Sequence, residues 1–184
     1  MAIPQKKYKV MGKLFNQKYL DLAFFILLVL ATSFVLMSSA NLPSQMASHF
    51  NEAGTADGFM SKERYTCVML SVVAGVPCLL ALTPFVISKL PTSLVNIPHR
   101  AYWLAPENRA ATLKTFHVFM RELACFHLIF LSYLHWLVIQ ANEQQPPAMS
   151  APDLYLGFFI FLLLIGIWSV LLLRQFQLTP AEER

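Results

Sequence analysis

The amino-acid sequence predicts an all-α fold, a four-helix transmembrane bundle in which residues 1–184 form a single integral membrane domain. Hydrophobic residues make up 57% of the chain and charged residues only 13%, whereas soluble domains contain about 25% charged residues. Four long apolar runs divide the sequence, and the basic residues are unequally distributed between the segments that join them. We therefore expect both termini in the cytoplasm and a short extracytoplasmic loop cap on the bundle.

Each apolar run is close to the ~20 residues that an α-helix needs to cross about 30 Å of hydrocarbon. Backbone polar groups in lipid must be paired within the structure, so these runs are expected to be helices. Pro106 and Glu107 favour a helix start, because proline suits the first turn and an acid there offsets the helix dipole. The third helix is therefore expected to begin near 106. The predicted spans lie at about residues 20–40, 65–87, 123–141 and 154–173.

The basic residues predict the orientation, because cytoplasmic loops are enriched in Lys and Arg. Of the 14 Lys and Arg residues, 12 fall in the two terminal tails or between the second and third spans. The other two, Lys62 and Arg64, lie between the first and second spans, which places the segment around His49 outside. Because the charges are split among tails and loops and form no single stripe, nucleic acid is not an expected partner. The expected partner is the lipid bilayer.

The outside segment between the first two spans concentrates the polar chemistry of the chain. Gly54 and the Asp57-Gly58 pair favour turns. Four residues could each bind a metal, but their spacings of three, five and six match no tight ligand pattern, so no metal is predicted. They are His49, Glu52, Asp57 and Glu63. The segment is interpreted either as a compact loop held by His49 and Asn51 or as a binding site for an extracellular partner, with a metal site as a third reading.

Two motifs stand out along the first part of the chain. The outside motif comprises Leu42, Pro43, His49, Phe50, Asn51, Gly54, Asp57 and Lys62. The cytoplasmic motif comprises Asn96, Pro98, Tyr102, Trp103, Pro106, Glu107 and Arg109. Together, in this order, they resemble a bacterial membrane family of unknown function, number 1648. That family also forms the N-terminal part of SdpI-type proteins, which give immunity to a secreted toxin and relay its presence. The resemblance covers about the first 110 residues and implies a multi-pass protein of the bacterial cytoplasmic (inner) membrane.

The third helix contains a possible intramembrane polar site, since ionisable groups inside a span merit a functional hypothesis. Its members are Arg121, Glu122, His127 and His135. Arg121 and Glu122 are expected to reach the inner interface. His127 and His135 are eight residues apart, hence ~12 Å along the axis and turned by ~80°, so they cannot grip one haem iron from opposite sides. Neutral histidines hydrogen-bonded across the bundle are expected, with single-histidine or intersubunit haem ligation as the remaining alternative.

The sequence contains no nucleophile elbow or acid pair, so no enzymatic activity and no catalytic residue is predicted. The expected function is docking or sensing, either as an SdpI-like factor or as an accessory subunit bound to other membrane protein subunits, with no cofactor. The alternative is a small carrier or cofactor-binding membrane protein that uses the histidines of the third helix as a proton or metal relay.

Overall fold

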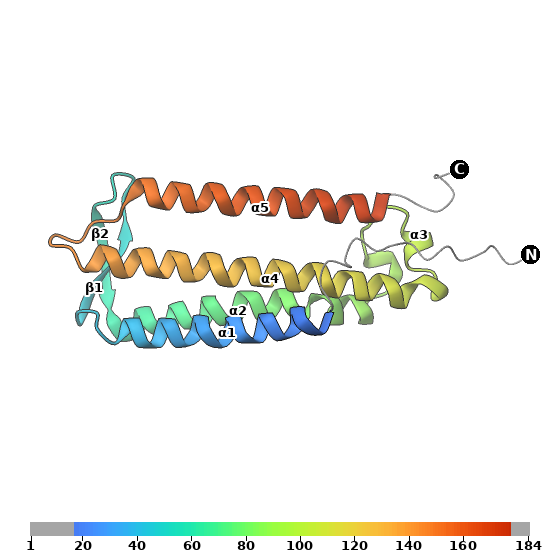
Figure 1. The fold of residues 1–184 in the computed structure, drawn as a ribbon, viewed down its shortest axis with the longest axis horizontal. Helices are drawn as coiled ribbons and strands as arrows, with labels where there is room; N and C mark the ends of the chain where they lie inside the picture. The colour runs from blue at the N-terminus through green and yellow to red at the C-terminus, as the bar shows by residue number, and fades with distance from the viewer. Residues whose placement is uncertain (1–16, 178–184) are drawn as a thin grey trace, which may run out of the picture.

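The computed structural model describes residues 17–177 (Figure 1). Within them, four helices are long and apolar enough to cross a membrane, which confirms that part of the predicted fold. In chain order, the elements are α1 (Gln17–Ser39), β1 (Gln45–Phe50), β2 (Ala56–Ser61), α2 (Lys62–Lys89), a short 3₁₀ turn η2 (Thr92–Leu94), α3 (Arg100–Trp103), α4 (Pro106–Asn142) and α5 (Ala151–Gln177). The strands and α3 lie at opposite ends of the long helices, which we call the hairpin end and the α3 end (Figure 1).

The all-α prediction is wrong at the hairpin end, where β1 and β2 pair antiparallel. The predicted turn at Asp57-Gly58 is also wrong, because both residues lie in β2 and the chain turns at residues 51–55. The sequence hides β1 because Met46 and Ala47 are neighbours and both buried, which breaks the alternation typical of a strand. Met46 packs with Leu42 and Tyr65, whereas Ala47 lies against Asn142 of α4, so both faces of the strand are covered at this point. The register shifts on either side of His49 make the strand irregular further along.

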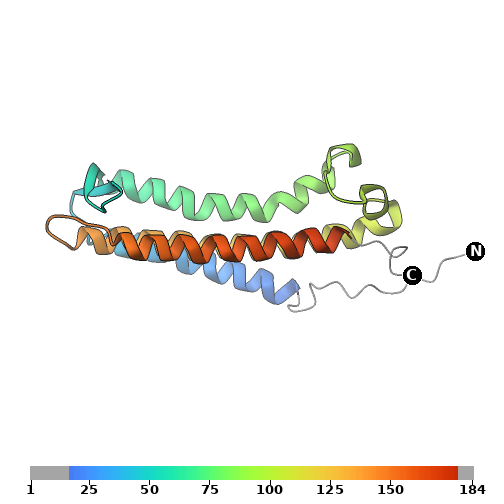
Figure 2. The same cartoon turned by 90° about the horizontal axis from the view of Figure 1, so that it is seen from above.

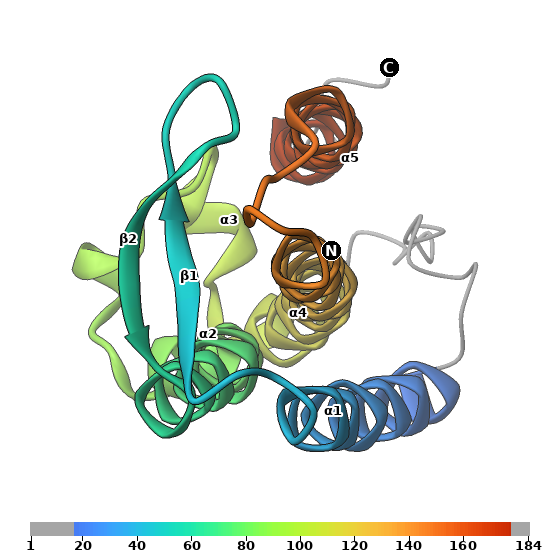
Figure 3. The ribbon, with the colours of Figure 1, turned by 90° about the vertical axis from the view of Figure 1, so that its left-hand side faces the viewer.

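Helix α4 is the centre of the bundle, with α1, α2 and α5 arranged around it (Figure 3). Seen along the bundle, α5 lies on the opposite side of α4 from α1 (Figure 3). Away from the hairpin end, α1 and α2 diverge, as Figures 2 and 3 both show. The buried cluster between α1, α2 and α4 is apolar and consists of Leu20, Phe24, Ala31, Val35, Val73, Val118, Ala124, Cys125 and Leu128.

Among the long helices, α5 packs mainly against α4. In the most apolar 18-residue stretch of α5 only 6% is buried, against 28% in the corresponding stretch of α4. Aromatic contacts form the joint: the rings of Phe130 and Phe161 stack at 4.0 Å between centroids, and Trp168 Nε1 donates to Phe119 O at 3.0 Å. The remaining faces of α5 are apolar and open to lipid or to another helix.

Candidate functional site at the hairpin

The turn of the hairpin is organised by the outside-motif residues Asn51 and Gly54. Asn51 Oδ1 accepts hydrogen bonds from the backbone N–H groups of Ala53 and Thr55, both at 3.0 Å. Gly54 has φ +80°, and a Cβ there would collide with Met149 O. Only glycine adopts this conformation without strain, so both residues have structural reasons to be present.

Two further contacts hold the hairpin against the end of α4 and the loop that follows it. Met149 N donates to Gly54 O at 2.8 Å. Asn142 binds both polar groups of Ala47, accepting from its N–H at 2.8 Å and donating to its carbonyl at 2.9 Å. Sequence reasoning missed Asn142, because a polar residue at a helix end carries no signal of a partner 95 positions away.

The base of the hairpin uses other outside-motif residues. Leu42 is buried with Met46 and Tyr65, and Lys62 Nζ donates to Ala40 O at the end of α1, at 3.2 Å. Phe50 is half-buried and Pro43 is exposed. Most of the outside motif therefore stabilises the junction of α1, the hairpin and α2.

His49 and Asp57 differ from the rest of the motif because their polar groups face outward. His49 Nδ1 lies 2.5 Å from Asp57 Oδ1 across the hairpin, with side chains 74% and 45% exposed. Gly58 makes room for the imidazole, since a Cβ there would lie 2.8 Å from His49 Cβ. Such an exposed side-chain contact contributes little stability, about 0–1 kcal/mol.

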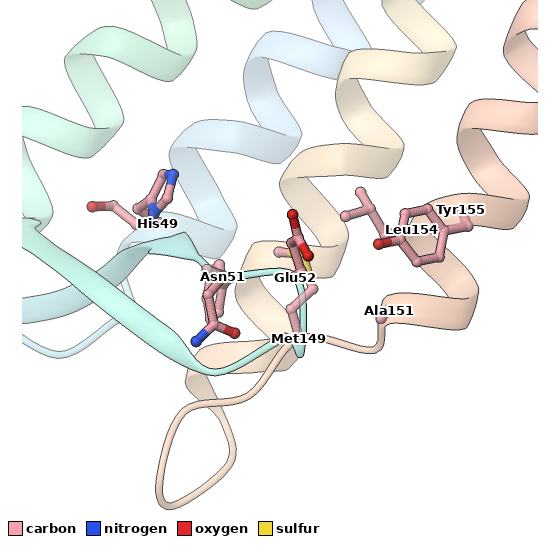
Figure 4. Close-up of a pocket in the computed structure, with 10 residues that line it drawn as sticks. His49, Asn51, Glu52, Met149, Ala151, Leu154 and Tyr155 are labelled. Carbon is pink, nitrogen blue, oxygen red and sulfur yellow. The ribbon is translucent and has the colours of Figure 1, made fainter.

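A pocket of about 280 Å³ lies between the turn of the hairpin and the start of α5. Figure 4 shows His49 and Glu52 on the hairpin side, with Leu154 and Tyr155 on the α5 side. The pocket combines a carboxylate, an imidazole and a phenol with apolar walls. This composition suits a small polar group, cationic or hydrogen-bond-donating, attached to an apolar body. No group of three potential metal ligands lies together in residues 17–177.

The cytoplasmic-motif residues at the α3 end bind helix termini. Trp103 Nε1 donates to Phe176 O near the end of α5, at 3.0 Å. Arg109 donates to Ser88 O at 3.0 Å and Leu90 O at 3.3 Å, two carbonyls at the end of α2. These terminal carbonyls have no partner within their own helices, so the two side chains tie α2 and α5 to the segment that starts α4.

The other members of that motif shape the same connection. Pro106 is in the first turn of α4 and Glu107 follows it, while the Tyr102 ring packs edge-on against Trp103 at 5.1 Å. Pro98 is half-buried and Asn96 is exposed. The motif therefore forms a joint between α2, α4 and α5, and none of its residues lines the pocket beside the hairpin.

The ionisable residues of α4 are distributed along the helix and do not form one site. Near the α3 end, Asp21 Oδ1 accepts from Arg121 Nε and contacts His117 Nε2, both at 2.8 Å. The Arg121 guanidinium also lies 4.5 Å from the centre of the Phe24 ring. Arg121 is paired between α1 and α4, and its side chain is only 12% exposed. Glu122 has no hydrogen bond or ion pair within the described part of the chain.

His135 lies near the hairpin end and is fully buried. Its Nε2 is 2.7 Å from Ser38 Oγ and its Nδ1 is 2.8 Å from Tyr65 Oη. Because Ser38 Oγ donates its one proton to Phe34 O, it accepts from Nε2, and Nδ1 accepts from Tyr65. His135 thus links α1, α2 and α4 as a neutral imidazole with both nitrogens occupied.

His127 is separate from this network. Its Nδ1 lies 2.8 Å from Leu123 O within α4, and its ring packs edge-on against Phe161 of α5 at 5.1 Å. The two histidines therefore face different neighbours. No chain of described polar contacts connects His127, His135 and the Arg121–Asp21 pair, so the geometry does not favour the predicted relay.

Residues 25–75 match the model of a family described as a domain of unknown function (DUF1648). This match confirms the family resemblance for the segment that contains most of α1, the whole hairpin and the first half of α2. The cytoplasmic motif lies beyond it. No curated protein and no solved structure matches the chain.

Proposed function

We propose that this protein is a non-enzymatic multi-pass membrane protein that docks or senses another molecule through the pocket between the hairpin and α5. One observation carries the proposal. Among the motif residues of the family-matched segment, His49 and Asp57 are the polar pair whose groups bond to each other and remain exposed beside a pocket. Asn51, Gly54 and Lys62 stabilise the turn and the base of the hairpin, whereas His49 and Asp57 have no such structural role.

The occupant of the pocket is a protein of the same membrane or of the space beside it. Polar groups from the hairpin would bind a donor or a cationic side chain, and the apolar walls from α5 would bury the neighbouring part of that partner. The open faces of α5 support lateral association with other helices at the same time. An SdpI-like factor and an accessory subunit of a larger complex both fit this mode of action.

The proposed orientation places the hairpin outside a bacterial cytoplasmic membrane and both termini inside. It is supported by the 12 basic residues of the tails and the second connection against the two of the hairpin connection. In this orientation, the pocket is accessible to extracytoplasmic molecules. The Arg109 and Trp103 joint lies on the cytoplasmic side.

Photo-crosslinking in native membranes tests the proposal. A photoreactive amino acid replaces Tyr155, which lines the pocket, and in a matched control it replaces Glu143, which lies at the same end without lining it. We expect a discrete adduct from position 155 alone. Its yield should fall about tenfold on His49→Ala or Asp57→Asn, the loss expected for a charge-assisted hydrogen bond. Absence of an adduct at 155, or a yield indifferent to both substitutions, would contradict the proposal.

A further inference from the structure

A second depression lies between the end of α1 and the start of α2, separate from the hairpin pocket. It has a volume of about 400 Å³ and is open along one side. Its residues recur at helical spacing on two facing stripes, one containing Leu36 and Ser39 and the other containing Lys62, Glu63 and Leu70. It shares no residue with the pocket beside α5.

The groove has opposite charges at the end nearest the hairpin and apolar side chains further along the helices. Lys62 and Glu63 stand at the first turn of α2. Lys62 Nζ uses one of its three donors on Ala40 O and retains two. The Glu63 carboxylate makes no hydrogen bond or ion pair with any residue in 17–177. Leu36 and Leu70 continue the groove along the spans of α1 and α2.

Ser39 adds an independent observation that points to a ligand. Its side chain is 1% exposed and lines the groove. Its hydroxyl is the buried side-chain polar atom that lacks a hydrogen-bond partner in the part of the chain that the structure describes. Buried polar groups are nearly always hydrogen-bonded, so an orphaned hydroxyl beside a groove needs a bonding partner.

We propose that this groove binds a phospholipid whose headgroup carries both a phosphate and a primary ammonium. The phosphate accepts from Lys62 and the Ser39 hydroxyl, the ammonium donates to Glu63, and an acyl chain follows Leu36 and Leu70. A soluble ligand would leave those leucines unused, and an anionic lipid without an amine would leave Glu63 facing a like charge. The groove lies where the apolar spans end, the depth at which headgroups lie.

Native mass spectrometry of the full-length protein in mild detergent tests the site. The protein is incubated with phosphatidylethanolamine, phosphatidylcholine or phosphatidylglycerol of identical acyl chains. We expect retention of phosphatidylethanolamine above the other two, because the trimethylammonium group cannot donate to Glu63 and phosphatidylglycerol has no cation. Glu63→Gln and Lys62→Gln should each weaken that retention about tenfold.

Matched variants separate a lipid site from general surface charge. Arg64→Gln and Glu143→Gln remove a cation and an acid at the same end of the bundle, outside the groove, and should leave retention unchanged. Ser39→Ala should weaken retention without lowering the midpoint of thermal unfolding, because it removes a hydroxyl with no protein partner. If Ser39 had a purely structural role, Ser39→Ala would lower the unfolding midpoint and leave lipid retention unchanged.

Three outcomes would overturn the inference. Equal retention of the three lipids would contradict the headgroup assignment. Retention unaffected by the substitutions at Lys62 and Glu63 would place the lipid elsewhere. Comparable binding of soluble O-phosphoethanolamine would show a site for a free phosphate compound. None of these results bears on crosslinking at Tyr155, so the two proposals fail independently.

Discussion

At the α3 end, Trp103 and Arg109 donate to backbone carbonyls of α5 and α2, whereas at the hairpin end His49 and Asp57 bond to each other and remain open to solvent. Both pairs belong to motifs that the sequence analysis singled out. One motif contributes its polar groups to helix termini, where they are structurally required. The other motif places two polar groups where the fold does not depend on them. We therefore distinguish a structural joint at the α3 end from a recognition surface at the hairpin end.

The largest expected effect comes from Gly54, which positions the recognition surface. Gly54→Ala forces an alanine into the left-handed region and against Met149 O, so we expect a loss of about 2–4 kcal/mol in the free energy of unfolding. Urea titration of the purified protein in detergent measures it. Gly75→Ala is the matched control, because a Cβ there meets nothing within 4 Å. A similar loss at both glycines would contradict the assigned role of the turn.

At the α3 end, Arg109→Gln removes both hydrogen bonds to the end of α2. We expect a loss of about 1.5–3 kcal/mol, typical of bonds made by a charged donor. Arg100→Gln is the control, because Arg100 makes one exposed bond to Ser93 O and should cost under about 1 kcal/mol. If both arginine variants unfold at the same urea concentration, the joint does not depend on Arg109.

The joint between α4 and α5 is expected to respond to Gly157, where a Cβ would collide with the Tyr133 ring. Gly157→Ala should cost about 1–3 kcal/mol, the usual cost of overpacking. Gly166→Ala, on the same helix with nothing within 4 Å, should be neutral or stabilising because alanine favours helix. Limited proteolysis of the loop that precedes α5 would report the loosening, and equal cleavage of both variants would argue against this contact.

The long helices could be predicted because a span depends only on local composition and length. The hairpin could not, since Met46 and Ala47 are both buried, which removes the period-2 pattern, and its register also depends on an irregularity around His49. The same irregularity brings His49 opposite Gly58 and within reach of Asp57. Sequence reasoning singled out the motif residues but not Asn142, which bonds to Ala47 from 95 positions away. It also missed Tyr155 and Ser39, which line the two pockets, because only tertiary packing brings these segments together.

The smallest expected effect on stability, and the sharpest test of the comparison, comes from His49→Ala. Because the imidazole is largely exposed and its bond to Asp57 is solvated, the free energy of unfolding should change by less than about 1 kcal/mol. The same variant should abolish most of the adduct formed from a photoreactive residue at position 155. Trp103→Phe at the other end should do the opposite, lowering stability through the lost bond to Phe176 O while leaving the adduct intact. If His49→Ala unfolds the protein as readily as Trp103→Phe does, the hairpin pair is a structural element, and the distinction between the two ends disappears.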